Sequence, residues 1–187
     1  MIATFFTAVM AFIATNTDDL FINMLLFSAT TDKKQTTAIV QGKFLGTALL
    51  LVISGSAAFG LQAVAGNRLW LLGFVPIALG LKVLWNNIRG NNEDEAESIT
   101  PSGAVNTALI TLASGADNIG VYIPLLAGFT FGQMMFCAVI FFVMTGLFCI
   151  LGKKLAEMPV FRTVMEKYRQ ILTPVIYIAL GLYVIFC

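Results

Sequence analysis

The sequence predicts an all-α integral membrane protein with six transmembrane helices, arranged as two inverted-topology repeats of three helices. Three observations predict this class: the composition, the number of long apolar segments and an internal duplication. Of the 187 residues, 58% are hydrophobic and 11% are charged, and the mean hydropathy is +0.88. Soluble domains carry about 25% charged residues. We therefore expect one membrane domain, and a net charge of +1 without a large basic cluster argues against a nucleic-acid partner.

Six segments are apolar enough to cross a bilayer, which takes about 20 helical residues. The first contains Asp18 and Asp19 and lacks a basic start, so we interpret it as a retained span and not as a cleaved signal peptide. The expected spans are approximately 2–29, 37–64, 69–88, 103–129, 131–152 and 170–187.

The third observation is a motif that occurs twice, each time with an acid inside an apolar run. Residues 14–22 read ATNTDDLFI and residues 113–121 read ASGADNIGV, at an offset of 99. Segments 77–85 and 178–186 share six of nine residues at an offset of 101. An odd number of spans per repeat inverts the second repeat, and in transporters such a repeat interface holds the binding site near the membrane midplane.

These matches divide the chain into two halves of three spans. The first repeat is expected over 1–88 and the second over 103–187, joined by an acidic cytoplasmic linker at 89–102.

The distribution of basic residues predicts the orientation. Ten Lys and Arg residues fall in or beside the connections after spans 1, 3 and 5, and only Arg68 falls on the other side. The positive-inside rule then makes the odd-numbered connections cytoplasmic and places both termini outside. We interpret Lys43 and Lys82 as snorkelling residues near cytoplasmic helix ends, which leaves no Lys or Arg at mid-depth.

Span 1 carries polar side chains at helical spacing. Asn16, Asp19 and Asn23 are three and four residues apart and therefore share one face. Thr15 and Asp18 form an adjacent stripe, and both aspartates can reach one cavity if the helix is locally unwound.

Span 4 offers a comparable polar face in the second repeat. Its polar residues are Ser114, Asp117, Asn118 and Tyr122. Pro124 and several glycines follow or flank the acid, so we expect this helix to be kinked or broken near Asp117.

A carboxylate at mid-depth in a bilayer costs about 2.5–3.5 kcal/mol and is functional by default. The combined ligand set of carboxylates, amides and hydroxyls suits divalent cations, and its hardness favours magnesium, calcium or manganese over cadmium. The chain has no His, which excludes imidazole ligands. Cys137, Cys149 and Cys187 are widely separated, and we interpret them as packing residues.

The repeated motif, the six spans and the basic odd-numbered connections together resemble the cadmium-resistance transporter family of the lysine-exporter superfamily. The NTDDLF element at 16–21 is the most specific part of the resemblance. The resemblance implies export of cadmium or related divalent cations across the cytoplasmic membrane of a bacterium. It also implies that Asp18 and Asp19 bind the metal, with Asp117 and Asn118 completing the site.

The energy source is expected to be a proton gradient. No nucleotide-binding motif is present. A buried carboxylate cluster should hold protons when empty and release them when a divalent cation binds, which gives metal/proton antiport. The expected partners are therefore metal ions, protons and lipid, with a homo-oligomer left open; no resident cofactor is expected.

Other functions remain open at this point. They are an exporter of amino acids or other organic solutes, an intramembrane aspartyl enzyme that uses Asp19 and Asp117, and a partner subunit without transport of its own. A zwitterionic solute would need a fixed cation or free helix N-termini for its carboxylate, and no Lys or Arg is expected at mid-depth. The acids could also serve only to hold helices together. We interpret Gly42-x-x-x-Gly46 as close helix packing and not as a binding element.

Overall fold

The computed structural model describes residues 1–30, 32–65 and 103–157, with isolated helical positions between 74 and 85 and between 178 and 185. The predicted spans 69–88 and 170–187 lie almost entirely outside these residues, as do the linker 89–102 and the matched segments 77–85 and 178–186. The elements within the described ranges are all helices, as predicted. They are α1 (Ile2–Ser28), α2 (Lys33–Ala65), α4 (Ala104–Ser114), α5 (Ala116–Ala127) and α6 (Phe131–Ala156).

Four of the six predicted spans are recovered in this part of the chain. Helices α1, α2 and α6 are each long and apolar enough to cross a membrane, and α4 with α5 makes a fourth if the bent pair is counted as one span. The helix ends agree with the predicted spans to within four residues. The six-span count itself remains a prediction.

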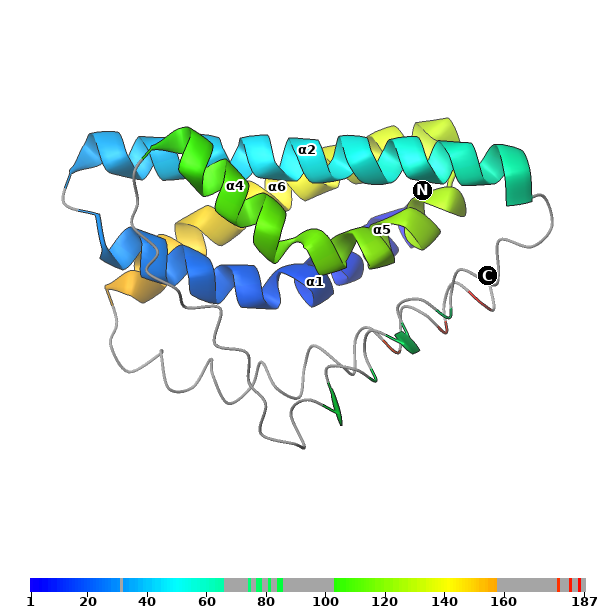
Figure 1. Cartoon of the computed structure of the whole chain (residues 1–187), viewed down its shortest axis with the longest axis horizontal. Coiled ribbons are helices and arrows are strands. Elements are labelled where there is room, and N and C mark those ends of the chain that lie inside the picture. The colour runs from blue at the N-terminus through cyan, green and yellow to red at the C-terminus, as the bar shows by residue number, and fades with distance from the viewer. Residues whose placement is uncertain are drawn as a thin grey trace.

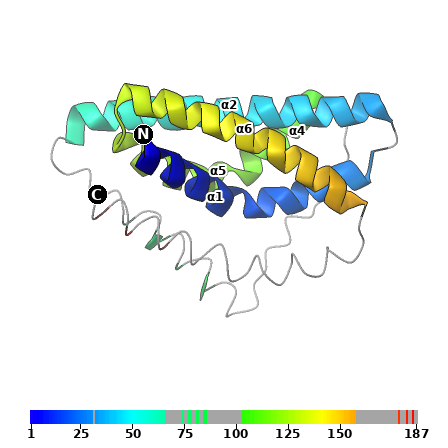
Figure 2. The same ribbon diagram turned by 180° about the vertical axis from the view of Figure 1, so that it is seen from behind.

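The helices pack mainly between the two halves of the chain. Helix α1 packs along α6, whereas α2 packs against α4 and α5 and also contacts α6 (Figure 1). Seen from behind, α6 crosses the bundle diagonally, from the last turns of α2 to the last turns of α1 (Figure 2). The first turn of α2 and the last turn of α6 therefore lie at the same end of the bundle. This arrangement gathers Lys33, Lys34, Lys153 and Lys154 at that end.

Exposed apolar side chains form continuous stripes on the outer helices. On α6 they recur at every fourth residue, which keeps them on one side of the helix. Similar residues cover the outer side of α2. Apolar surface of this extent is unusual on a soluble monomer and fits contact with lipid. The stripe on α6 consists of Met135, Val139, Val143, Leu147 and Leu151.

An aromatic cluster fixes α1 and α5 against α6. The ring of Phe12 lies edge-on to Phe141 and Phe148, with centroid distances of 5.3 and 5.1 Å. Tyr122 from α5 lies 4.9 Å from Phe141. All four side chains are buried, so this cluster orients the polar face of α1 that follows Phe12.

Two glycines allow α2 and α4 to approach closely. A methyl group at Gly42 would lie 2.5 Å from Cβ of Thr107, and one at Gly46 would lie 2.6 Å from Cβ of Thr111. Both distances are too short for real carbon contacts. The interpretation of Gly42-x-x-x-Gly46 as a packing motif is therefore confirmed.

Two helices lose their regularity beside the acids. Helix α1 has non-helical dihedrals at Asn16 (φ −111°, ψ 15°). Helix α4 ends before Gly115 (φ −92°, ψ 11°), and α5 restarts at a bend of 67°. The predicted break near Asp117 is thus confirmed, and Asp117 lies in the first turn of α5, where the helix dipole favours an acid.

Candidate cation site

A small polar cavity lies between α1, α2 and α6. Its volume is about 10 Å³, about the space of one water-sized species. Asn16, Asp19 and Asn23 line it from α1, which confirms that these three residues share one face. The remaining lining residues are Phe12, Lys43, Thr47, Thr145 and Phe148.

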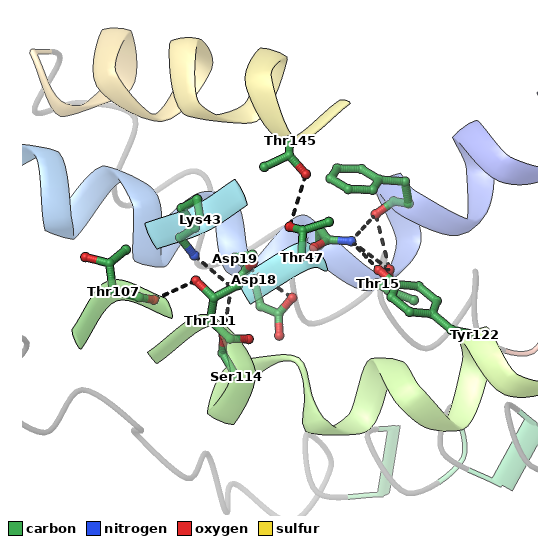
Figure 3. A network of polar contacts seen from close by, with 12 residues as sticks. Thr15, Asp18, Asp19, Lys43, Thr47, Thr107, Thr111, Ser114, Tyr122 and Thr145 are labelled. Atoms are coloured by element: carbon green, nitrogen blue, oxygen red, sulfur yellow. Dashed lines mark hydrogen bonds and ion pairs between the residues drawn. The ribbon is translucent and has the colours of Figure 1, made fainter. Parts of the chain in front are cut away.

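Asp19 is the central residue of the site. It is 7% exposed, and its Oδ1 atom accepts a 2.8 Å hydrogen bond from the Ser114 hydroxyl at the end of α4. The same oxygen lies 3.2 Å from Nζ of Lys43 on α2. Figure 3 shows these side chains converging on the carboxylate. One carboxylate of α1 is thereby held by two other helices.

The interpretation of Lys43 as a snorkelling residue is wrong. Its side chain is 2% exposed and pairs with Asp19 inside the bundle. The physical reason is that α2 begins at Lys33, four residues before the predicted start of the span. Lys43 therefore lies ten residues into the helix, about 15 Å along its axis.

A hydrogen-bonded network fixes the kink of α1. Nδ2 of Asn16 lies 3.0 Å from the Phe12 carbonyl oxygen, 2.8 Å from Oγ1 of Thr15 and 2.8 Å from the Tyr122 hydroxyl. The hydroxyls of Thr15 and Tyr122 lie 2.9 Å apart, and Thr15 donates to the Ala11 carbonyl oxygen. The distorted turn before the acids is therefore tied to α5.

Asn23 presents an unsatisfied oxygen. It is 2% exposed, yet its Oδ1 atom accepts no hydrogen bond from any residue in the described part of the chain. A methyl group at Gly152 would lie 2.6 Å from Cβ of Asn23, so the glycine makes room for Asn23 against α6. Across the cavity, the hydroxyls of Thr47 and Thr145 lie 3.2 Å apart.

The other predicted ligands do not line this cavity. Asp18 is half-buried and accepts a 3.1 Å hydrogen bond from the Asp19 amide. Asp117 is half-buried and Asn118 is buried, both in the first turns of α5. Within the described ranges, no three Asp, Glu or Cys side chains are close enough together to hold one metal ion. In this conformation the structure brings together Asn16, Asp19, Asn23 and Ser114, with Thr15 in the adjoining network.

The two described cysteines are free and buried, as the packing interpretation expects. Cys137 belongs to the hydrophobic core that also contains Phe12 and Phe141. Cys149 packs with Leu26 and Ile39. Cys187 lies outside the described residues.

Sequence reasoning missed Lys43, Thr47 and Thr145. A signal for Lys43 was present: Asp32-x-x-Gln35 is a helix N-terminal capping pattern, and the Gln35 amide donates to Oδ1 of Asp32 at 2.7 Å. That pattern starts the helix at Lys33 and moves Lys43 inward, with Thr47 one turn further on the same face.

The comparisons with known proteins identify the family of the chain. No curated protein and no solved structure matches the chain. Residues 12–187 match the family model described as cadmium resistance transporter. The match covers most of the chain, including α2, α6 and both copies of the acidic motif, and it confirms the resemblance drawn from that motif. The chain therefore belongs to the cadmium resistance transporter family.

Proposed function

We propose that this protein exports divalent metal cations, cadmium or related ions, from the cytoplasm of a bacterium in exchange for protons, and that Asp19 is the central ligand. One observation supports this most directly: a buried carboxylate lines the same water-sized cavity as the Asn23 amide oxygen, which has no hydrogen-bond partner among the described residues. The helices around this cavity are long enough to span a membrane. The family suggests metal export as the activity.

The chemistry of the cavity favours a small dehydrated cation. Asp19 supplies negative charge, while Asn23 and the hydroxyls of Thr47 and Thr145 supply neutral oxygen. Oxygen ligands suit hard divalent ions, and buried carboxylates compensate their charge. A cavity of about 10 Å³ has no room for an organic solute.

The remaining acids complete the site in our proposal. Asp18 follows the kink of α1 and Asp117 follows the break before α5. Because Gly115 separates α4 from α5, a change in the bend there would move Asp117 and Asn118 relative to Ser114. We propose that such a movement gathers Asp18, Asp117 and Asn118 around the cation, with Asn16 and Thr15 holding the kink of α1.

The packing pattern supports the inverted repeat and alternating access. If the first and second spans of one half correspond to the fourth and fifth spans of the chain, then α1 corresponds to α4–α5 and α2 to α6. The first span of each half packs against the second span of the other: α1 against α6, and α4–α5 against α2. The helix contacts are therefore the same when the two halves of the chain are interchanged.

The position of Lys43 bears on the organic-solute alternative. A buried lysine provides the fixed cation that a substrate carboxylate needs, and its absence was the argument against such a substrate. Lys43 is already paired with Asp19, however, and the cavity is too small for an amino acid. For an aspartyl enzyme, Asp19 and Asp117 would have to share a proton, yet Asp117 does not line the cavity of Asp19.

The test is flux through the purified chain in liposomes. Cadmium, zinc, manganese, magnesium and calcium are added separately outside the liposomes, with and without an acidic interior, so that protons leave the liposome as metal enters. We expect uphill movement of at least one of these ions and an opposite movement of protons. Asp19→Asn should abolish the flux. Asp32→Asn is the matched control, because it makes the same change at an exposed acid and keeps the capping of α2. Flux of lysine or another amino acid without metal flux would establish the alternative instead.

A further inference from the structure

The ion pair between Lys43 and Asp19 places a positive charge of the protein at the cation site itself. Nζ of Lys43 lies 3.2 Å from Oδ1 of Asp19, and Lys43 lines the same cavity as Asn23 and Thr47. The ammonium group carries three N–H donors. Beyond the ion pair, it makes no hydrogen bond to any residue that the structure describes.

Such a group is poorly explained by stability alone. A buried ammonium loses its hydration, and a single ion pair without further hydrogen bonds offsets that loss incompletely. The apolar stem of Lys43 is buried, and a leucine or methionine could be buried at the same position without a charge. The under-coordinated ammonium therefore points to a role at the site.

Among the described residues, several titratable groups belong to the helices packed around Lys43, and Asp19 contacts it directly. Asp18 and Asp19 belong to α1, Asp117 and Tyr122 to α5, and Cys149 to α6. Helix α4 carries no titratable side chain. Of these groups, Asp19 is the one in an ion pair with Lys43.

We propose that Lys43 is the selectivity residue of the site: its ammonium group occupies Asp19 in the absence of cargo, and only a cation that displaces it can bind. This inference rests on the proposed function, because it takes Asp19 as the ligand of the transported ion. A monovalent cation that replaces the ammonium gains no additional attraction to Asp19, since the charges are equal. A divalent cation doubles the attraction and displaces the lysine.

The competition between Lys43 and the transported cation for Asp19 also keeps the affinity for that cation low enough for its release. The flexible four-carbon stem lets the ammonium group withdraw and return while the backbone of α2 stays in place. When it returns to Asp19, it replaces the departing ion as counter-charge. The Asp19 carboxylate therefore has a positive partner in either state, so the exchanged protons bind other groups of the proposed site.

The test uses the full-length chain in detergent, with Cd²⁺ as the probe and Na⁺ as the monovalent competitor. Lys43→Gln keeps hydrogen-bond donors near Asp19 and removes the charge, while Lys43→Arg keeps the charge. Lys34→Gln is the matched control, because Lys34 lies in the first turn of the same helix and is exposed. We expect Lys43→Gln to bind Cd²⁺ about tenfold more tightly or better, as expected for loss of a close charge pair. Na⁺ should now compete with Cd²⁺ in this variant.

The other variants should retain discrimination against Na⁺. A folded Lys43→Gln protein with unchanged or weaker Cd²⁺ affinity, and with Na⁺ still excluded, would refute the role of Lys43 and leave metal export intact. Failure of the native chain to bind or move any divalent ion would instead refute the proposed function.

A second measurement does not depend on the folding of Lys43→Gln. In nitrogen-15 spectra of the native chain, the lysine signal that is missing from Lys43→Arg should shift when Cd²⁺ is added. A signal that stays unchanged at saturating Cd²⁺ would show that the ammonium is not displaced, which would also refute the proposal.

Discussion

Asn16, where α1 is kinked, and Gly115, where α4 gives way to α5, are equivalent residues of the duplicated motif, separated by the same offset of 99. Their dihedral angles are similar, with φ −111° and ψ 15° against φ −92° and ψ 11°. In each copy an acid follows two residues later, Asp18 or Asp117. The two copies of the motif therefore share their local backbone geometry as well as their sequence, which strengthens the inverted-repeat proposal.

The first prediction concerns the break at Gly115. Its dihedrals are open to other residues, but a methyl group there would lie 2.5 Å from Cδ1 of Leu50 and 2.9 Å from the Thr111 carbonyl oxygen. We expect Gly115→Ala to destabilise the protein by about 1–3 kcal/mol and to reduce metal flux. Thermal unfolding in detergent and liposome flux measure the two effects. Gly132→Ala is the control, because no described residue lies within 4 Å of a methyl group at that position. Equal behaviour of the two variants would argue against a constrained break.

The second prediction separates stability from transport at the Lys43–Asp19 pair. Asp19→Asn leaves a buried ammonium without its counter-charge, and we expect a loss of about 3–5 kcal/mol in unfolding free energy. Adding Lys43→Gln removes that charge and should recover most of the loss. Metal flux should remain absent in the double variant because the carboxylate is gone. Recovery of flux together with stability would show that Asp19 is a structural residue and not a ligand.

The sequence was sufficient to predict where the polar faces lie, because the spacing of Asn16, Asp19 and Asn23 follows directly from helix geometry. It also predicted the break before Asp117, since glycine and proline weaken the helix at that point. Both conclusions depend only on residues that are close in the sequence, because helix periodicity and helix breaking are local properties of the chain.

The sequence was insufficient for contacts between helices. The ion pair of Lys43 with Asp19 and the bond between Thr47 and Thr145 depend on how α2 crosses α1 and α6. An early start of α2 by four residues moved Lys43 from the expected helix end to the site. Depth in a bundle therefore depends on helix ends, which sequence patterns define least sharply.

The third prediction tests the close packing of α2 against α4 at Gly46. A methyl group at Gly46 would lie 2.6 Å from Cβ of Thr111 and 3.2 Å from the Ala108 carbonyl oxygen, so the helices would have to separate. We expect Gly46→Ala to lower stability by about 1–3 kcal/mol. A methyl group at Gly55 on the same helix would meet no described residue within 4 Å. Gly55→Ala should therefore leave stability unchanged or raise it slightly, since alanine favours helix. A harmless Gly46→Ala would mean that α2 and α4 do not pack this closely.

The fourth prediction concerns the network at the kink of α1. Tyr122→Phe removes the hydroxyl that Thr15 and Asn16 contact at 2.9 and 2.8 Å. We expect a loss of about 1 kcal/mol in stability and slower metal flux, because the kink beside the acids is less firmly held. Thr37→Val removes an exposed hydroxyl bonded within α2 and serves as the control, with an effect within about 0.5 kcal/mol. Native metal flux in Tyr122→Phe would show that this hydrogen-bonded network is not needed for transport.

The last prediction concerns orientation in the membrane. The connection between α1 and α2 lies at the same end of the bundle as the last turn of α6, and the connection between α5 and α6 belongs to the other end. Single cysteines replacing Asp32 or Glu157, both exposed, should react with an impermeant reagent only from the cytoplasm. A cysteine replacing Gly132, also exposed, should react only from outside. Cys137, Cys149 and Cys187 are first replaced by alanine or serine. Opposite labelling of all three positions would reverse the orientation drawn from the basic residues, while labelling of Asp32→Cys and Glu157→Cys from different sides would contradict the packing of the helices themselves.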